Sequence, residues 1–386
     1  MKQTKNLIAL SIISVIFAGC QKETNSSSQA DEVSAASNSF SLAGNGGSAG
    51  HVYTLSNQAG GNSVMDFYRA VNGSLTFNAS YPTGGNGTGS GLGNQGGVIL
   101  TDGNDVVLAV NAGSHTISSL NVTDIGLSLK STVSSAGMQP VSLTQHGNLV
   151  FVLNAGGTGN ISGFTLDNSG MLHPIANSTS PLSSTSAGAA QIDFINNGKV
   201  LAITEKATNK ITTYTVSGSG IPGAMHTLTS VNPTPFGFAV GNQGNIFVSE
   251  AVGGAPGAST LSSYQISNDG SISLVDGPVG ANQSAACWVV ITNNGKYAYT
   301  TNTASDNLST FNVNISTGSI SVLEALSATT PAGPIDAALS NNSKFLYVLN
   351  GAGHSISVFA VANDGSLSNV QTVPGLPASA NGLAAK

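Results

Sequence analysis

Apolar and polar residues alternate in short runs along most of the chain, from about residue 50 to the C-terminus. The run FLYVLN at residues 345–350 places Phe345, Tyr347 and Leu349 on one side, and similar runs recur throughout. A period of two residues indicates β-strands whose two faces meet different surroundings. No helical periodicity of convincing length interrupts these runs, so the pattern predicts an all-β fold.

The runs form seven repeats. A polar residue ends the first half of each repeated segment, about 49 residues after its predecessor on average. These residues are Ser56, Asn111, Asn154, Glu205, Glu250, Asn302 and Asn350. Turn sequences such as INNGK and SNDG separate the strands, and Asn-Gly and Asp-Gly supply the positive φ that tight hairpins need. Four antiparallel strands repeated seven times at this period predict a seven-bladed β-propeller.

The two ends of the propeller are predicted to meet in its first blade. The first repeat begins directly at the strand that follows His51 and lacks an innermost strand of its own. The last eight residues, 379–386, read like the innermost strand of another blade. Because a ring left open would expose unpaired strand edges, we expect the C-terminal strand to complete the first blade and close the ring.

The first twenty residues predict a location at the cell envelope. Lys2 and Lys5 precede an apolar stretch at residues 7–17, too short to span a bilayer, and small residues lead directly to Cys20. This layout resembles a bacterial lipoprotein signal peptide with Cys20 as the lipidated residue. The expected organisation is a signal peptide over 1–19, a flexible Ser-, Asn- and Gly-rich tether over 20–49 and the propeller over 50–386. We expect the lipid anchor to hold the protein at a membrane, the outer membrane by analogy.

Composition narrows the classes of function. Only 7% of the residues are charged, the net charge is −6, and Arg69 is the sole arginine, which argues against nucleic-acid binding because phosphates require clustered Lys and Arg. The six histidines show no metal-ligand spacing, so no metal is expected, and no motif calls for a cofactor. We expect a monomer.

One repeat in particular carries a family resemblance. The segment YAYTTNTASDNLSTFNV at residues 297–313 resembles the YVTN type of propeller repeat, and the seven repeats over residues 50–386 resemble the lactonase-type seven-bladed propellers, which include a 6-phosphogluconolactonase. The resemblance implies hydrolysis or isomerisation of a small lactone at the channel mouth. The same blades also occur in non-enzymatic surface proteins, so a binding propeller for a glycan or a protein is the alternative.

The candidate catalytic residues are Glu205 and Glu250, which break the Asn and Ser pattern in two adjacent repeats. Neighbouring carboxylates repel each other, which can leave one as a general base and the other as an acid. The alternative is that each Glu caps local backbone amides. The candidate ligand-binding residues lie at the same end of the blades or at the starts of the innermost strands, and they are Asn111, Asn154, Gln191, Lys206, Trp288, Asn302, Asp336, Asn350 and His354.

Two further features concern the channel mouth. Lactonases of this type often carry His or Arg where the innermost strands begin, whereas this chain has Gln191, Phe236, Trp288 and Asp336 there, which argues against a phosphorylated sugar lactone. Lys206 is the nearest substitute cation. The Gly-rich stretch 84–97 contains a G-x-G-x-x-G spacing but precedes a strand, so we interpret it as a long loop that crosses the ligand face.

Overall fold

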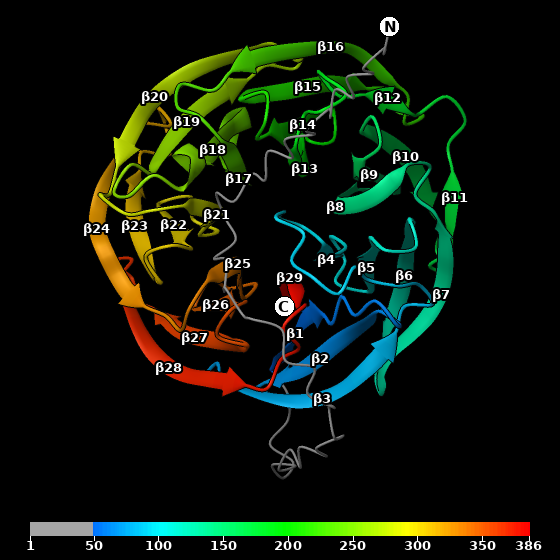
Figure 1. Cartoon of the computed structure of the whole chain (residues 1–386), viewed down its shortest axis with the longest axis horizontal. Helices are drawn as coiled ribbons and strands as arrows, with labels where there is room; N and C mark the ends of the chain where they lie inside the picture. The colour runs from blue at the N-terminus through cyan, green and yellow to red at the C-terminus, as the bar shows by residue number, and fades with distance from the viewer. Residues whose placement is uncertain (1–48) are drawn as a thin grey trace, which may run out of the picture.

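A computed structural model describes residues 49–386, and these form one ring of seven sheets around a central axis (Figure 1). The predicted signal peptide, the lipidation site Cys20 and all of the tether except its last residue lie outside the described residues. Each sheet is a blade of antiparallel strands, which confirms the seven-bladed propeller. Among residues 49–386 no helix is long and apolar enough to cross a membrane.

The first four blades have the following strands, from the axis outward. Blade 1 contains β29 (Asn381–Ala385), β1 (Gly50–Leu55), β2 (Ser63–Arg69) and β3 (Leu75–Pro82). Blade 2 contains β4 (Val98–Leu100), β5 (Val106–Asn111), β6 (Thr116–Thr123) and β7 (Gly126–Ser134). Blade 3 contains β8 (Met138–His146), β9 (Leu149–Gly156), β10 (Asn160–Leu166) and an outer strand split into β11 (Leu172–Pro174) and β12 (Ser180–Pro181). Blade 4 contains β13 (Ala189–Ile195), β14 (Val200–Glu205), β15 (Lys210–Val216) and β16 (Pro222–Thr229).

The last three blades follow the same plan. Blade 5 contains β17 (Pro235–Val240), β18 (Asn245–Glu250), β19 (Thr260–Ile266) and β20 (Ile272–Gly280), with short 3-10 turns at η1 (Asn242–Gly244) and η2 (Val252–Gly254). Blade 6 contains β21 (Ala286–Ile291), β22 (Tyr297–Asn302), β23 (Asn307–Val313) and β24 (Ile320–Thr329). Blade 7 contains β25 (Pro334–Leu339), β26 (Phe345–Asn350), β27 (Ser355–Val361) and β28 (Leu367–Pro374).

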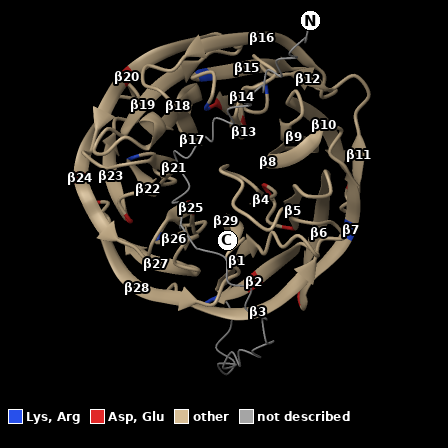
Figure 2. Cartoon of the chain, viewed as in Figure 1, with Lys and Arg blue, Asp and Glu red and all other residues tan. Residues whose placement is uncertain are grey.

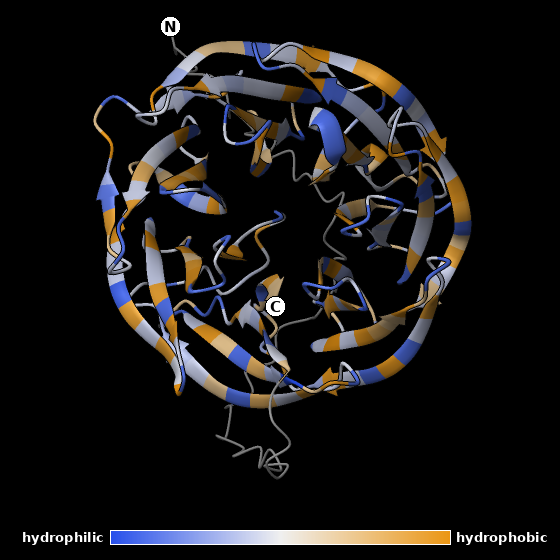
Figure 3. Cartoon of the chain, turned by 180° about the vertical axis from the view of Figure 1, so that it is seen from behind, coloured by the Kyte–Doolittle hydropathy of each residue, from blue (hydrophilic) through white to orange (hydrophobic). Residues whose placement is uncertain are grey.

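The core lies between the blades. On β14, Leu201 and Ile203 pack in a cluster with residues of blade 3, whereas Val200 and Ala202 pack with residues of blade 5. Successive side chains therefore pack against the blades on opposite sides. This is why the second strand of a blade is buried on both faces. Along the outermost strands polar and apolar residues alternate (Figure 3), because one face of each sheet edge meets solvent.

The C-terminal strand closes the ring as predicted. Strand β29 pairs antiparallel with β1, with Ala384 opposite Tyr53. The single arginine then fastens the end of the chain: Arg69 Nε donates to the carbonyl of Lys386 at 3.0 Å, and its Nη2 donates to the carbonyl of Ala49 at 2.6 Å. Strands from both ends of the propeller thus share one blade, and the ring has no open edge.

Candidate functional site

The aligned polar residues at the ends of the second strands face the interior of their own blades. Asn302 donates from Nδ2 to Asn307 Oδ1 and Ser309 Oγ, both at 2.8 Å, and Asn350 donates to Ser355 and Ser357 in the same way. Asn111 and Asn154 also bond to the strand or turn beside them, and all four are buried. They tie the second strand to the third, and none of them lines the central cavity described below.

Glu205 takes the same position in blade 4. Its side chain is fully buried, and its carboxylate accepts hydrogen bonds from Thr208 at 2.7 Å, from Thr212 at 2.8 Å and from both the backbone N–H and the hydroxyl of Ser183. Every partner belongs to blade 4 or to the segment that leads into it. The carboxylate therefore holds its own blade together.

Glu250 repeats this arrangement in blade 5. It is fully buried, and the hydroxyls of Ser230, Thr260, Ser262 and Tyr264 donate to it at 2.6 to 3.0 Å. Neither this carboxylate nor that of Glu205 lines the central cavity. The contacts favour the alternative interpretation, in which each Glu is a local cap, and they give the catalytic interpretation no geometric support.

The Gly-rich stretch does cross the face on which the innermost strands begin. Residues 84–97, which we call the plug loop, run from blade 1 to blade 2 by way of the channel mouth (Figure 1). Gln95 forms a paired hydrogen bond with Val289 on β21, donating to its carbonyl at 2.9 Å and accepting from its N–H at 3.2 Å. Gly96 accepts from the N–H of Leu143 on β8 at 2.8 Å. The plug loop is thereby fastened to the innermost strands of blades 3 and 6.

Two predicted ligand-binding residues hold this loop. The indole Nε1 of Trp288 donates to the carbonyl of Asn94 at 2.6 Å. Lys206 Nζ donates to the carbonyl of Gly93 and lies 4.5 Å from the centre of the Phe236 ring, and burial lowers the pKa of this amine to about 8. Both side chains recognise the chain's own backbone, so the plug loop occupies the place where the sequence predicts a ligand. His354 lies exposed in the turn after β26 and does not line the cavity.

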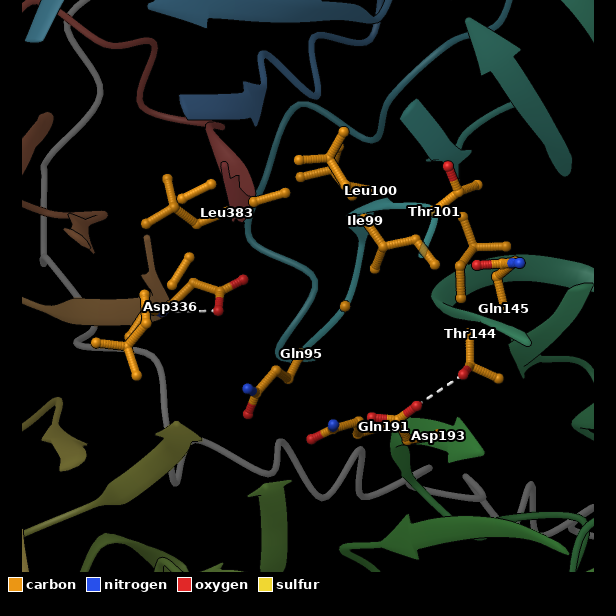
Figure 4. A pocket seen from close by; sticks show the side chains of 18 of the residues that line it. Gln95, Ile99, Leu100, Thr101, Thr144, Gln145, Gln191, Asp193, Asp336 and Leu383 are labelled. Atoms are coloured by element: carbon orange, nitrogen blue, oxygen red, sulfur yellow. Dashed lines mark hydrogen bonds between the residues drawn. The ribbon is translucent and has the colours of Figure 1, made fainter. Parts of the chain in front are cut away.

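A cavity of about 480 Å³ lies on the axis beyond the plug loop, toward the face where the innermost strands end. Figure 4 shows its walls, which come from the innermost strands of blades 1, 2, 3, 4 and 7 and from Gln95 of the plug loop. The volume lies in the range of about 300–1,000 Å³ typical of small-molecule sites. Gln191, expected from the sequence at the channel mouth, lines this cavity beyond the loop. Its side chain pairs with the backbone of Phe238, donating at 2.9 Å and accepting at 2.7 Å.

Asp336, another candidate from the sequence, brings a buried carboxyl group into this cavity. The residue is 1% exposed, its Oδ1 accepts from the N–H of Ala337 at 2.7 Å, and its Oδ2 has no hydrogen bond of good geometry, although the backbone N–H of Leu383 lies close to the carboxyl group. Burial raises the pKa of this carboxyl well above its usual range. Burial therefore disfavours the ionised form of Asp336 and favours the form that carries a proton.

Asp193 faces the cavity from the other side, on β13 (Figure 4). It is half-buried, and its Oδ1 accepts from Thr144 Oγ1 at 2.7 Å and from the N–H of Phe194 at 2.8 Å. Burial raises its pKa to about 6, against the opposing effect of these hydrogen bonds. Sequence reasoning missed Asp193, although its position two residues after Gln191 on the same strand could have indicated it.

No Lys or Arg lines the cavity among residues 49–386. Figure 2 shows how sparse charged residues are over the whole ring. The same residues contain no group of three or more His, Cys, Asp or Glu arranged to hold a metal ion. The site therefore offers two carboxyl groups of unlike environment, neutral amides and hydroxyls, which suits an uncharged polar ligand.

The fold has well-defined relatives among known proteins. The family model "Lactonase, 7-bladed beta-propeller" matches residues 252–385, which span the last part of blade 5, blades 6 and 7 and nearly all of β29. The chain is a lactonase-like seven-bladed propeller. This lactonase-like propeller shares 18% identity with a candidate 6-phosphogluconolactonase from Bacteroides uniformis, with a TM-score of 0.67 over 86% of this chain and 98% of that one.

A second solved structure is that of a periplasmic gluconolactonase from Pseudomonas aeruginosa. It shares 16% identity with the lactonase-like propeller, with a TM-score of 0.65 over 85% of this chain and 98% of that one. A search of curated protein sequences finds no match. At these identities the likeness establishes the fold, and the chemistry has to be argued from the site.

Proposed function

We propose that this lactonase-like propeller hydrolyses a small, uncharged sugar lactone in its central cavity. The observation that carries the proposal is the pair Asp193 and Asp336, which line one cavity from opposite sides in unlike environments. Two carboxyl groups in unlike environments can divide the roles of base and acid. The names of the gluconolactonase and 6-phosphogluconolactonase neighbours support a lactone, and a cavity wall without Lys or Arg among the described residues favours one without phosphate.

In this mechanism the carboxylate of Asp193 accepts a proton from a water molecule as its oxygen attacks the lactone carbonyl carbon. The ring C–O bond then breaks, and the leaving ring oxygen takes the proton of Asp336. The product is the open hydroxy acid. Transfer of the proton from Asp193 to Asp336 through water restores the starting state.

The proposal also places the protein at the bacterial cell envelope, lipid-anchored through Cys20. This part depends on the residue pattern at positions 2–20 alone. Membrane fractionation of cells that make the intact chain and a Cys20→Ser variant tests it, since the variant should leave the membrane fraction.

A pH-indicator screen of the full chain against sugar, aliphatic and aromatic lactones tests the proposed activity. We expect Asp193→Asn and Asp336→Asn each to lower kcat/KM by about 100-fold or more, the usual contribution of general acid–base catalysis. The rate should rise as the pH passes through about 6, because Asp193 is a base only when ionised. Asp364→Asn, in an exposed turn of blade 7, is the matched control and should retain activity.

Two results would contradict the proposal. The first is that the double variant Glu205→Gln, Glu250→Gln stays folded but loses turnover, while both Asp variants keep it. The reaction would then take place at the ends of the second strands, near Glu205 and Glu250. If no lactone of the panel were hydrolysed, the alternative of a binding propeller would be favoured.

A further inference from the structure

The central cavity continues into a second hollow on the face where the innermost strands end. Asp102, Gln145 and Asp193 line both hollows, so the two are contiguous. The second hollow, of about 560 Å³, extends outward over the inner turns of blades 4 and 5. We call the two together the trough. Each half has the volume of a small-molecule site, so the trough has room for a ligand of more than one ring.

The outer half of the trough presents unused amide groups. Asn197, Asn242 and Asn268 line it, are exposed, and make no side-chain hydrogen bond to any residue that the structure describes. Each amide offers two donors and an acceptor. Hydroxyl groups, which both donate and accept, are the natural complement of such a wall.

The charged side chains of the trough restrict the class of ligand further. Neither half contains a Lys or Arg among the described residues, and the acidic side chains present are Asp102, Asp193 and Asp336. Anionic polymers are therefore disfavoured, since they are bound by Arg and Lys. An extended peptide is disfavoured as well, because Gln191 and Gln95 already pair with the free edges of β17 and β21.

An aromatic surface flanks the junction of the two halves. The ring of His146 packs against that of Phe194 with 6.0 Å between centres, and both residues line the outer half. The His146 side chain is 39% exposed, and its Nδ1 lies 4.0 Å from Asp102 Oδ2. A flat ring beside hydrogen-bonding amides provides an apolar contact for the C–H face of a sugar.

We infer that the trough binds a short neutral oligosaccharide, with its terminal ring in the central cavity and the next units over the inner turns of blades 4 and 5. The inference depends on the proposed function only in taking the terminal ring to be the lactone that reacts. Binding of the oligosaccharide itself requires no chemistry.

Isothermal titration calorimetry on the full chain tests the inference, with neutral cello-, malto- and N-acetylchito-oligosaccharides of one to four units as probes. We expect at least one series to bind, with an affinity that rises about tenfold or more from one unit to three. Asn242→Ala and Asn268→Ala should each weaken binding of the trisaccharide several-fold and leave binding of the monosaccharide unchanged. Asn363→Ala removes an equally exposed turn amide outside the trough and should change neither.

The outcomes separate this inference from the proposed activity. Oligosaccharide binding without hydrolysis of any lactone would support the inference that the trough binds oligosaccharides, and it would contradict the lactonase proposal. Lactone hydrolysis with equal affinity for one and three sugar units, or with no binding of any neutral series, would overturn the inference that the trough binds oligosaccharides. Tighter binding of a peptide or of an acidic oligosaccharide than of every neutral series would overturn it too.

Discussion

At the scale of single residues, the partners of a carboxyl group decide its role. Glu205 and Glu250 stand out in the sequence because they interrupt a run of Asn and Ser. Each carboxylate accepts several hydrogen bonds inside its own blade, at the position where Asn302 and Asn350 donate in theirs. Asp336 looks ordinary in the sequence, yet one of its buried oxygens has no hydrogen bond of good geometry. A buried polar group without a partner is costly, so its presence in a cavity points to function.

Asp193 should make the stability of the fold depend on pH. Its pKa is raised from 3.8 to about 6, so between these values the folded state binds more protons than the unfolded state, and stability falls as the pH rises. The loss is roughly 2 kcal/mol when the partial exposure of the group is allowed for. Asp193→Asn should remove this fall and be more stable at pH 7, as measured by urea unfolding between pH 4 and pH 7. Asp124→Asn, in an exposed turn, is the control; an unchanged profile in Asp193→Asn would show that the group ionises normally.

At the scale of elements, the plug loop decides which end of the channel can receive a ligand. The sequence indicates that this loop crosses the ligand face, and its glycines allow close approach to the walls, as at Gly97, where a Cβ would lie 2.7 Å from Asn381 Nδ2. Only the structure shows that Trp288 and Lys206, expected at a ligand, are bound to the loop instead. The open part of the channel therefore lies beyond it.

The sole tryptophan reports on the plug loop directly. Gln95→Ala removes the paired hydrogen bond to Val289, so the loop should loosen and water should reach Trp288. We expect a red-shifted emission and acrylamide quenching that is several-fold stronger. Gln371→Ala removes a similar pair, between Gln371 and the backbone of Leu75 at the rim, and should leave the emission unchanged. Unaltered fluorescence in Gln95→Ala would mean that Gln95 does not fasten the loop.

At the scale of the whole molecule, ring closure couples all seven blades. Strand β29 supplies the innermost strand of blade 1 and also part of the cavity wall, through Leu383 and Ala384. Its loss would expose the inner edge of β1 and uncover the cores on both sides. Closure of the ring by β29 is thus required both for the stability of the fold and for a complete wall of the central cavity.

Deletion of residues 379–386 should unfold the ring in one cooperative transition at a much lower temperature, or prevent folding. Arg69→Met keeps the strand and removes only the clamp on Lys386 and Ala49, so its expected cost is smaller, about 1–3 kcal/mol. Differential scanning calorimetry of the two variants measures both effects. An unchanged Tm after the deletion would reject the closure.

The sequence by itself determined the blades, their number and the way the ring closes. These features depend on alternation, turn residues and repeat spacing, which are local and recur seven times, so each repeat supports the interpretation of the others. The sequence indicated only some of the residues that line the central cavity. Gln191 and Asp336, candidates from their positions at the starts of innermost strands, line the central cavity, and so does Asp193, which was not a candidate. The contacts of Glu205 and Glu250 favour the local cap that the sequence left open as the alternative to catalysis.

Only the tertiary structure decided which of these side chains meet. Asp193 and Asp336 belong to blades 4 and 7, and they share a cavity because the ring brings their innermost strands to one axis. Contacts between segments far apart in the chain decide how many hydrogen bonds a carboxyl group accepts. They also decide whether a loop or a ligand occupies the channel mouth. No local pattern encodes those contacts, since the same residue types fit either arrangement.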